Sequence, residues 1–332
     1  MPLWLKYLHM RKILLLILIL VFLFFSASFF INLFKPQIIL NKSITIEKGT
    51  SIAKIGNILE EKGIIRSAPI FITITKILKK EQKLHYGRFH FSGKYTLFRV
   101  FRMLSRAEIV LNPVTIPEGF TFYKIANMLT EISLVDYSKF IRLAKDTTFI
   151  YSLNIKTKNL EGFLFPDTYY IPYFADEEYI IKMMVDNFFS KWQTVHPKTM
   201  EFDSLYNTVI LASIIEKEAI FDDERSLIAS VYKNRLTNRM RLQADPTVAY
   251  ALELSGKTRK KIYYEDLKIN SIYNTYKHFG LPPTPICNPG IKSIIAALKP
   301  ENTNYFFFFA GKNSRHIFSS TYTEHLKKLN RI

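Results

Sequence analysis

The sequence predicts an α+β protein with an N-terminal membrane helix, small strand–helix modules and a mixed α/β domain at the C-terminal end. Three observations support this prediction. An uncharged apolar run occupies residues 13–34, an 18-residue pattern occurs twice at an offset of 70 residues, and the second half alternates helical and extended patterns. At about 150 residues per domain, a chain of 332 residues predicts about two domains.

The apolar run Ile13–Phe34 has the length of a membrane helix. A helix of 22 residues is about 33 Å long, which is enough to cross a bilayer. The residues before it include Lys6, Arg11 and Lys12, which predicts that residues 1–12 are a cytoplasmic tail and that the rest of the chain lies outside. A signal peptide cleaved near residues 26–28 is the alternative, but the apolar run continues beyond that point, which favours an uncleaved anchor.

The net charge of +18, from 46 Lys+Arg and 28 Asp+Glu, predicts anionic surroundings. An anchor that places most of the chain outside the cytoplasm argues against nucleic acid. Membrane head groups, a wall polymer or a biased composition remain as explanations of the positive charge. The single cysteine, Cys287, permits neither an internal disulfide nor a Cys-rich metal site, and the eleven glycines lack the spacing of a phosphate-binding loop. We therefore predict no metal and no cofactor.

Residues 44–61 and 114–131 form an internal repeat in which eight of 18 positions are identical. Each copy predicts a short strand, a glycine turn and an amphipathic helix, with Thr50-Ser51 and Thr121 as N-cap candidates. We therefore expect a region of small modules over residues 35–155, with a soft boundary near residue 155. The first copy lies in a lysine-rich stretch. Solvated lysines and an electrostatic hold on an anionic polymer or lipid are both open interpretations.

Residues 204–220 predict a helix that is apolar nearly all round and therefore buried. Glu216 and Glu218 lie near its end and, at about 100° per residue, point in nearly opposite directions, so they do not serve one site together. A carboxylate on a buried helix is costly unless it is paired, protonated or open to a cleft. The residues one turn before Glu216 are small, whereas those before Glu218 are isoleucines, so spacing favours Glu216 slightly.

The remaining C-terminal patterns predict further elements. Asp222-Asp223 precede a second helix as cap candidates, and Asp245 before Pro246 is either the N-cap of a third helix or a substrate contact. A proline-stiffened loop over residues 271–290 is a suitable platform for binding residues. A helix over 291–298, a hairpin over 305–320 and a capped last helix complete the expected order.

These motifs, taken in order, resemble the endolytic murein transglycosylase (YceG-like) family. The resemblance covers roughly residues 40–332. It is carried by the strings EGFLFPDTY, ASIIEKEA, VYKNRL, MRLQADPTVAYAL, YNTY, GLPP with the PI and NPG that follow it, YFFFFA and HIFSSTYTEH. The chain departs from the pattern at Ala219, where many relatives are expected to have threonine.

The resemblance implies a single-pass protein of the cytoplasmic membrane, bound to lipid through its helix. LysM-like modules would occupy residues 35–155 and a lytic transglycosylase domain residues 156–332. The enzyme would cut nascent peptidoglycan strands at the MurNAc–GlcNAc bond, beside peptidoglycan synthases, and leave 1,6-anhydro-MurNAc ends. It places the catalytic acid on Glu216, and a buried setting would raise the pKa of that carboxyl. Neither metal nor cofactor is implied.

We expect the polar and aromatic residues near this acid to bind the sugars, with loop scaffolding as the alternative role. The candidates are Gln243, Asp245, Tyr273, Asn274 and Tyr276. Two other functions stay open: a wall-binding protein that cuts nothing, and a muramidase that uses water. The muramidase requires a second acid near the first, and the candidates for it are Asp245, Glu161 and Asp167.

Overall fold

We describe a computed structural model of the chain, which places residues 3–47, 49–80, 83–106, 111–172, 175–196, 201–257, 259 and 261–331. The chain forms two compact units. The first comprises Met1–Asn112 with Tyr170–Phe174, and the second comprises Pro113–Tyr169 with Ala175–Ile332. The main division therefore falls between residues 112 and 113, whereas the sequence placed a soft boundary near residue 155.

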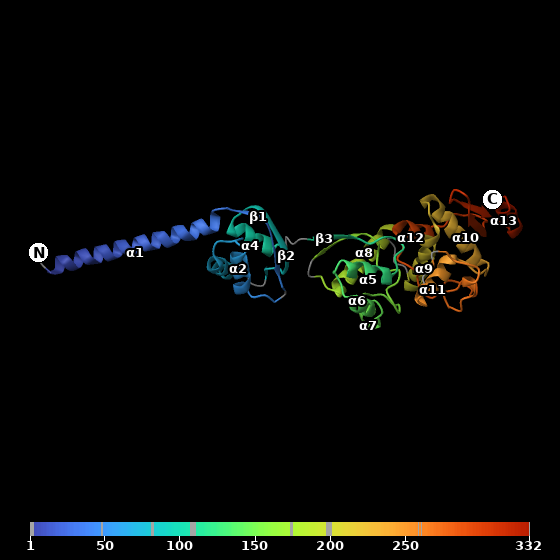
Figure 1. Ribbon diagram of the computed structural model, residues 1–332, viewed down its shortest axis with the longest axis horizontal. Helices are drawn as coiled ribbons and strands as arrows, with labels where there is room; N and C mark the ends of the chain where they lie inside the picture. Colours follow the sequence, from blue (N-terminus) through green and yellow to red (C-terminus); the bar gives the residue numbers. More distant parts are fainter. Residues whose placement is uncertain are drawn as a thin grey trace. The chain divides into compact units, whose positions relative to one another are not determined.

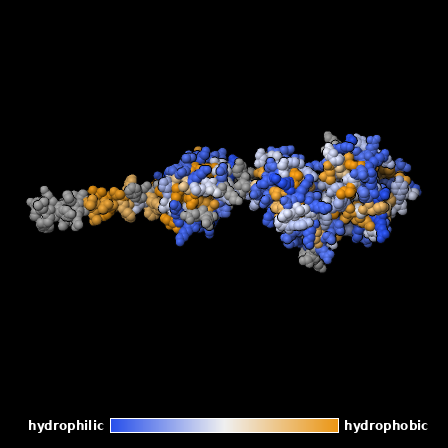
Figure 2. Space-filling view, turned by 90° about the horizontal axis from the view of Figure 1, so that it is seen from below, coloured by the Kyte–Doolittle hydropathy of each residue, from blue (hydrophilic) through white to orange (hydrophobic). Residues whose placement is uncertain are grey.

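The first helix, α1 (Leu3–Phe34), contains a window, Leu14–Ile31, that is long and apolar enough to cross a membrane. The described part of α1 presents an almost continuous hydrophobic surface (Figure 2). Phe22 and Phe24 are each 71% exposed, which is unfavourable in water and suits a lipid environment. Near its C-terminal end, Phe29 and Leu33 pack against the core of the first unit.

The first unit is a two-stranded antiparallel sheet covered by helices. Its elements are β1 (Gln37–Ile46), α2 (Ile52–Glu61), α3 (Ala68–Ile77), β2 (Gly87–Tyr95) and α4 (Leu97–Ser105) (Figure 1). The strands pair with Ile44 opposite Phe89, and a register shift lies between Ile39 and Lys42. Alternate side chains of β2 are buried, as expected for a sheet with one face on a core.

The second unit is mainly helical and contains the C-terminal motifs. The strand β3 (Leu111–Thr115) pairs with β4 (Thr168–Pro172), and both cross the division between the units. Between and after them lie α5 (Phe122–Glu131), α6 (Tyr137–Leu143), α7 (Thr147–Ser152), α8 (Glu177–Val195), α9 (Phe202–Glu218), α10 (Arg225–Thr237), α11 (Asp245–Leu254) and α12 (Ile291–Leu298). A hairpin, β5 (Phe307–Ala310) and β6 (His316–Ser319), leads into α13 (Tyr322–Leu329).

The helix α9 lies at the centre of the second unit. Every residue from Val209 to Ile215 is buried, which confirms the prediction of a buried helix from its continuous apolar pattern. It packs against α10, α11 and α12 (Figure 1). Its side chains share one core with those of Tyr232, Leu242 and Tyr250. Because α9 is fixed on several sides, the direction of each side chain near its end is fixed as well.

Both copies of the internal repeat fold as predicted, each with a strand, a glycine turn and a helix. The turns use Gly49 and Gly119 at φ values of 83° and 74°, a region that favours glycine. Ser51 and Thr121 accept the predicted capping hydrogen bonds at the starts of α2 and α5. The copies nevertheless belong to different units. The turn at Gly119 contacts the side chains of α9, so the second copy is part of the second unit.

Two predicted helix caps are wrong. The N-cap of α11 is Ala244, and Asp245 is the first helical residue without a side-chain capping bond. The N-cap of α10 is Glu224, which also makes no capping bond. Asp222 and Asp223 instead pair with cationic side chains of Arg225, Lys292 and Arg315. These tertiary partners offer the carboxylates charged contacts that a cap does not provide.

Substitution of Gly162 tests the packing of the segment that leads into β4. Gly162 has a φ of 88°, and an added Cβ would lie 2.6 Å from Pro285 and 2.7 Å from Val209 of α9. We expect Gly162→Ala to lower the free energy of unfolding by roughly 2–4 kcal/mol, from crowding together with backbone strain. Gly256→Ala is the matched control, since Gly256 has a φ of 78° but open space around it. Equal losses in denaturant titrations would show that crowding contributes nothing.

Candidate active site

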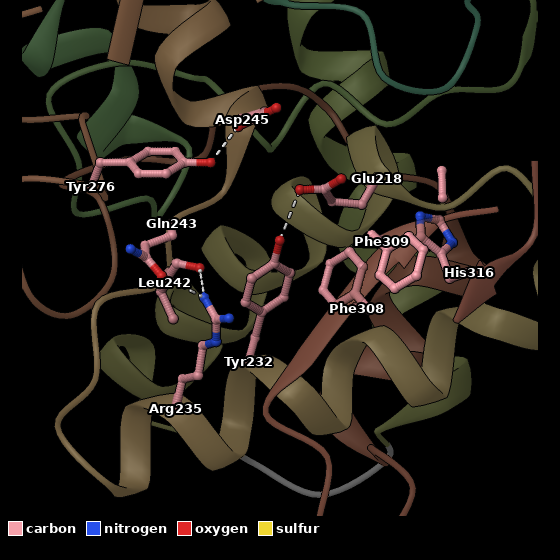
Figure 3. Close-up of a pocket in the computed structure, with 11 residues that line it drawn as sticks. Glu218, Tyr232, Arg235, Leu242, Gln243, Asp245, Tyr276, Phe308, Phe309 and His316 are labelled. Carbon is pink, nitrogen blue, oxygen red and sulfur yellow. Dashed lines mark hydrogen bonds between the residues drawn. The ribbon is translucent and has the colours of Figure 1, made fainter. Parts of the chain in front are cut away.

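A pocket of about 320 Å³ opens beside the C-terminal end of α9 (Figure 3). Helices α9 and α10, the segment before α11, the loop at residue 276 and the β5–β6 hairpin all contribute to it. Its wall combines aromatic and polar side chains. The lining residues are Glu218, Tyr232, Arg235, Leu242, Gln243, Asp245, Tyr276, Phe308, Phe309, Ala310 and His316.

Glu218 is the acid on the buried wall of this pocket. It is the last residue of α9, and one of its oxygens accepts a hydrogen bond from the hydroxyl of Tyr232 at 2.8 Å (Figure 3). Burial and the negative charge of Asp245 raise the pKa of Glu218, Tyr232 and Arg235 oppose the shift, and the resulting pKa is about 7. A carboxyl group in this state can both give and take a proton near neutral pH.

A polar wall of the pocket is built around Asp245 and Tyr276, whose hydroxyl donates to the Asp245 carboxylate at 2.5 Å (Figure 3). Gln243 precedes them with a φ of 51°, an unusual backbone geometry of the kind often found at functional sites. Arg235 is held in place because its guanidinium donates to the carbonyls of Leu242 and Phe306, each at 2.7 Å. The positive charge of Arg235 therefore has a fixed position in the wall of the pocket.

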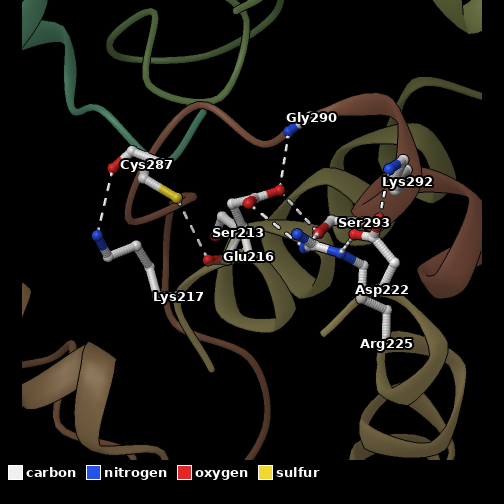
Figure 4. A network of polar contacts seen from close by, with 10 residues as sticks. Ser213, Glu216, Lys217, Asp222, Arg225, Cys287, Gly290, Lys292 and Ser293 are labelled. Carbon is white, nitrogen blue, oxygen red and sulfur yellow. Dashed lines mark hydrogen bonds and ion pairs between the residues drawn. The ribbon is translucent and has the colours of Figure 1, made fainter. Parts of the chain in front are cut away.

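Glu216 lies in a different environment, on the far side of α9 from the pocket. Its carboxylate accepts hydrogen bonds from the backbone N–H of Gly290 at 3.0 Å and from the Ser293 hydroxyl at 2.8 Å (Figure 4). The guanidinium of Arg225 lies 3.3 Å from its other oxygen. The side chains of Glu216 and Arg225 are only 6% and 8% exposed. This arrangement is a buried, fully partnered ion pair.

A second carboxyl group, that of Glu118, borders this ion-pair network. It lies against Gly290, where a Cβ would be only 1.8 Å from its Oε1, so position 290 has no room for a side chain. Burial raises the pKa of Glu118, and the charge of Glu216 raises it further. The glycine turn after Glu118 thus packs against the helix that carries both candidate acids.

Three of the five predicted substrate-binding residues lie in the pocket with Glu218, namely Gln243, Asp245 and Tyr276. The other two support the loop. The side-chain amide of Asn274 is buried and donates to the carbonyls of Leu267 and Ile269. Tyr273 bonds through its hydroxyl to Thr284 and packs edge-on against Tyr250. These contacts of Asn274 and Tyr273 are those of scaffold residues.

Two other predicted acid candidates lie in separate hydrogen-bond networks. Glu161 is fully buried, and it accepts from the Phe122 N–H and the Tyr250 hydroxyl. Burial raises the pKa of Glu161 to about 8. Asp167 accepts from Asn187 and pairs with Lys191. Neither side chain lines the described pocket, so of the three candidates for a second acid only Asp245 shares it with Glu218.

Several pocket residues were not singled out from the sequence. Tyr232 and Arg235 belong to the string VYKNRL, while Phe308, Phe309 and His316 belong to the final hairpin. The resemblance already contained these strings, but helix and strand periodicity presents them as core residues. A tyrosine or arginine inside an apolar helix face was the available signal, because a buried polar group needs a partner.

One carboxyl group with a raised pKa faces a pocket of aromatic and polar side chains, an arrangement that suits the class of acid–base enzymes. The sequence comparisons specify the class further. The YceG-like family matches residues 44–331, and the chain belongs to that family.

Relatives of known name agree with the family assignment. The chain is 34% identical over 304 residues to an endolytic murein transglycosylase of Bacillus subtilis, which covers 86% of this chain and 83% of the relative. It is 28% identical over 303 residues to the Streptococcus pneumoniae enzyme of the same name, covering 81% of this chain but 54% of that longer protein. The crystal structure of a putative yceG-like protein from Listeria monocytogenes superposes with a TM-score of 0.57 at 34% identity, covering 86% of this chain and 98% of that one.

The raised pKa of Glu218 has a consequence for stability that does not depend on activity. A carboxyl group whose pKa rises from 4.5 to about 7 on folding destabilises the folded state as the pH rises through that range. We expect Glu218→Gln to change stability little at pH 5 and to increase it at pH 8.5 by on the order of 3 kcal/mol. Denaturant titrations of both proteins at both pH values measure this, and a difference that does not change with pH would contradict it.

Proposed function

We propose that this chain is an endolytic murein transglycosylase that cleaves the MurNAc–GlcNAc bond of glycan strands and leaves 1,6-anhydro-MurNAc ends. Its relatives carry the name of that activity. The observation that carries the proposal at the level of chemistry is the single buried carboxyl group of Glu218, with a pKa of about 7, in a pocket with polar and aromatic walls. That setting suits a reaction in which one residue acts first as acid and then as base.

The proposed reaction needs one proton donor and no water. The carboxyl group of Glu218 protonates the glycosidic oxygen while the bond from that oxygen to C1 breaks. The hydroxyl on C6 of the same sugar then forms a bond to C1, and its proton passes to the Glu218 carboxylate. The acid is restored, and no nucleophile from outside the sugar is consumed. Attack within one sugar also has the proximity advantage of a unimolecular step.

In this proposal the acid is Glu218 rather than Glu216, which the resemblance and the local spacing favoured. Support comes from the partners of each carboxyl group. Glu216 has a cation and two other donors, so its charge is neutralised and its oxygens are engaged. Glu218 has one neutral donor, Tyr232, and lines the pocket. We assign Glu216 the role of an ion-pair anchor between α9, α10 and α12.

A muramidase that uses water remains the second candidate because Asp245 lines the same pocket as Glu218. A second carboxylate could activate water or attack C1, as in ordinary glycosidases. One oxygen of the Asp245 carboxylate is already engaged by the Tyr276 hydroxyl, which favours a binding role. The chemistry of the product ends distinguishes the two candidates.

The two carboxyl groups can be compared directly on uncrosslinked glycan strands, with the ends analysed by mass spectrometry. We expect Glu218→Gln to abolish the anhydro ends, because Gln cannot transfer the proton. Glu216→Gln should keep the same products per folded molecule while unfolding more easily by about 3 kcal/mol, because Arg225 loses the more buried of its two carboxylate partners. Loss of anhydro ends in folded Glu216→Gln, with activity kept in Glu218→Gln, would reverse the assignment. Reducing ends from the native chain would favour the muramidase.

We also propose that α1 anchors the protein in the cytoplasmic membrane with the second unit outside, where it meets nascent strands made by peptidoglycan synthases. The first unit would then be the LysM-like region near the membrane. Its exposed lysines, including Lys42, Lys54 and Lys94, give it a positive surface that suits anionic wall polymer or lipid.

Salt dependence tests the contribution of that charge. If the lysines attract anionic polymer, retention on isolated murein sacculi should fall when salt rises from about 50 to about 500 mM, because screening shortens the range of the attraction. A pelleting assay with the Glu218→Gln variant avoids digestion of the sacculi. Retention that is independent of salt would rule the electrostatic hold out.

A further inference from the structure

His316 lies on the wall of the pocket that contains Glu218, although the sequence assigned it only to the last hairpin (Figure 3). It is the first residue of β6, and its side chain is only 6% exposed. Its ring meets Phe308 edge-on with the centroids 5.2 Å apart, and Phe308 in turn contacts Tyr232, the partner of Glu218. Packing therefore holds the imidazole in one place, and contacts through Phe308 and Tyr232 connect it to Glu218.

The carboxylate of Glu224 fixes the orientation of this ring. Its Oε2 lies 2.8 Å from Nδ1 of His316, and its Oε1 accepts the backbone N–H of the same residue at 3.1 Å. The guanidinium of Arg315 approaches the same Oε1 at 3.5 Å. Both oxygens are thus acceptors, so Nδ1 must carry the hydrogen. In the neutral ring, Nε2 is then left with a free lone pair.

That lone pair has no hydrogen-bond partner in the part of the chain that the structure describes, and Nε2 is not among the buried unsatisfied atoms. Gln243 and Asp245 line the same pocket and also carry acceptor oxygens, but the groups that the structure holds in place there act as donors. Arg235 and the hydroxyl of Tyr276 donate to protein oxygens, and Glu218 must carry a proton to act as an acid. In its neutral form, His316 therefore offers the pocket an acceptor with a fixed direction, and a hydroxyl group of a sugar is the matching donor.

We propose that Nε2 of His316 accepts a hydrogen bond from the C6 hydroxyl of the MurNAc unit and orients its oxygen toward C1. This inference rests on the proposed transglycosylase function. The C6 oxygen forms its bond to C1, the bond from C1 to the leaving oxygen breaks, and Glu218 gives one proton and takes one. His316 gains and loses nothing overall. Glu224 is a positioning residue, because it acts on the sugar only through the tautomer of His316.

The variant Glu224→Gln reverses that tautomer with little change in shape. The backbone N–H of His316 and the Arg315 guanidinium still require an oxygen at the Oε1 position. The amide NH₂ therefore faces Nδ1, which must then become an acceptor, and the hydrogen moves to Nε2. The imidazole would present a donor where the hydroxyl needs an acceptor. Reversal of the His316 tautomer should therefore lower the rate more than the loss of a single packing contact would.

Three variants and a control test the inference on uncrosslinked glycan strands, with kcat, KM and the ratio of anhydro to reducing ends measured. His316→Ala and Glu224→Gln should each lower kcat roughly 100-fold with little change in KM, and should raise the share of reducing ends, since the hydroxyl is no longer oriented. His316→Gln, which can place a carbonyl near the Nε2 position, should recover part of the rate. His278→Ala, which changes an exposed histidine, should behave as the native chain does.

The ¹⁵N chemical shifts of the His316 ring report the tautomer directly, and a merely structural role would not move them. We expect hydrogen on Nδ1 in the native chain and on Nε2 in Glu224→Gln. Native kcat and native end ratios in folded Glu224→Gln, with the tautomer reversed, would overturn the inference. The proposed function fails separately, if the native chain produces reducing ends and no anhydro ends, and the assignment of Glu218 as the acid fails if Glu218→Gln continues to produce anhydro ends.

Discussion

The burial of two carboxyl groups on one helix is the constraint on which the second unit depends. Each group on α9 has to be neutralised, because an unpaired buried charge costs several kcal/mol. Glu216 is neutralised by pairing with Arg225 and by donors from α12, and Glu218 by holding a proton beside the Tyr232 hydroxyl. The same helix therefore has one carboxylate held in an ion pair and one carboxyl group whose pKa is raised.

The ion pair of Glu216 explains why several elements assemble where they do. Arg225 begins α10, and Gly290 and Ser293 belong to the start of α12, so one carboxylate connects three helices. Glu118, in the glycine turn of the second repeat copy, lies against Gly290. That contact gives a physical reason why the second copy belongs to the second unit although its sequence resembles the first. An internal repeat preserves a local fold but does not determine which neighbour its helix packs against.

Local structure followed from the sequence, whereas the roles of the site residues did not. The strand–turn–helix copies, their Ser51 and Thr121 caps and the buried α9 all depend on residues within a few positions of each other, so periodicity reveals them. The choice between Glu216 and Glu218 rested on small neighbours one turn away. In the structure, Glu216 is instead bound by Ser293, which is 77 residues distant in the sequence. The contact of His316 with Glu224 spans 92 residues and left no local pattern.

The balance of charges around Glu218 fits the demands of a mechanism with a single carboxyl group. Burial and the charge of Asp245 raise its pKa, while Tyr232 and Arg235 limit the rise, and the result lies at about 7. A much higher pKa would make the group a poor donor to the leaving oxygen, and a much lower one a poor acceptor for the C6 proton. Arg235 contributes to this balance because backbone carbonyls hold its guanidinium in place without neutralising it. The residues that keep Arg235 in place therefore contribute to the proposed chemistry without touching the acid.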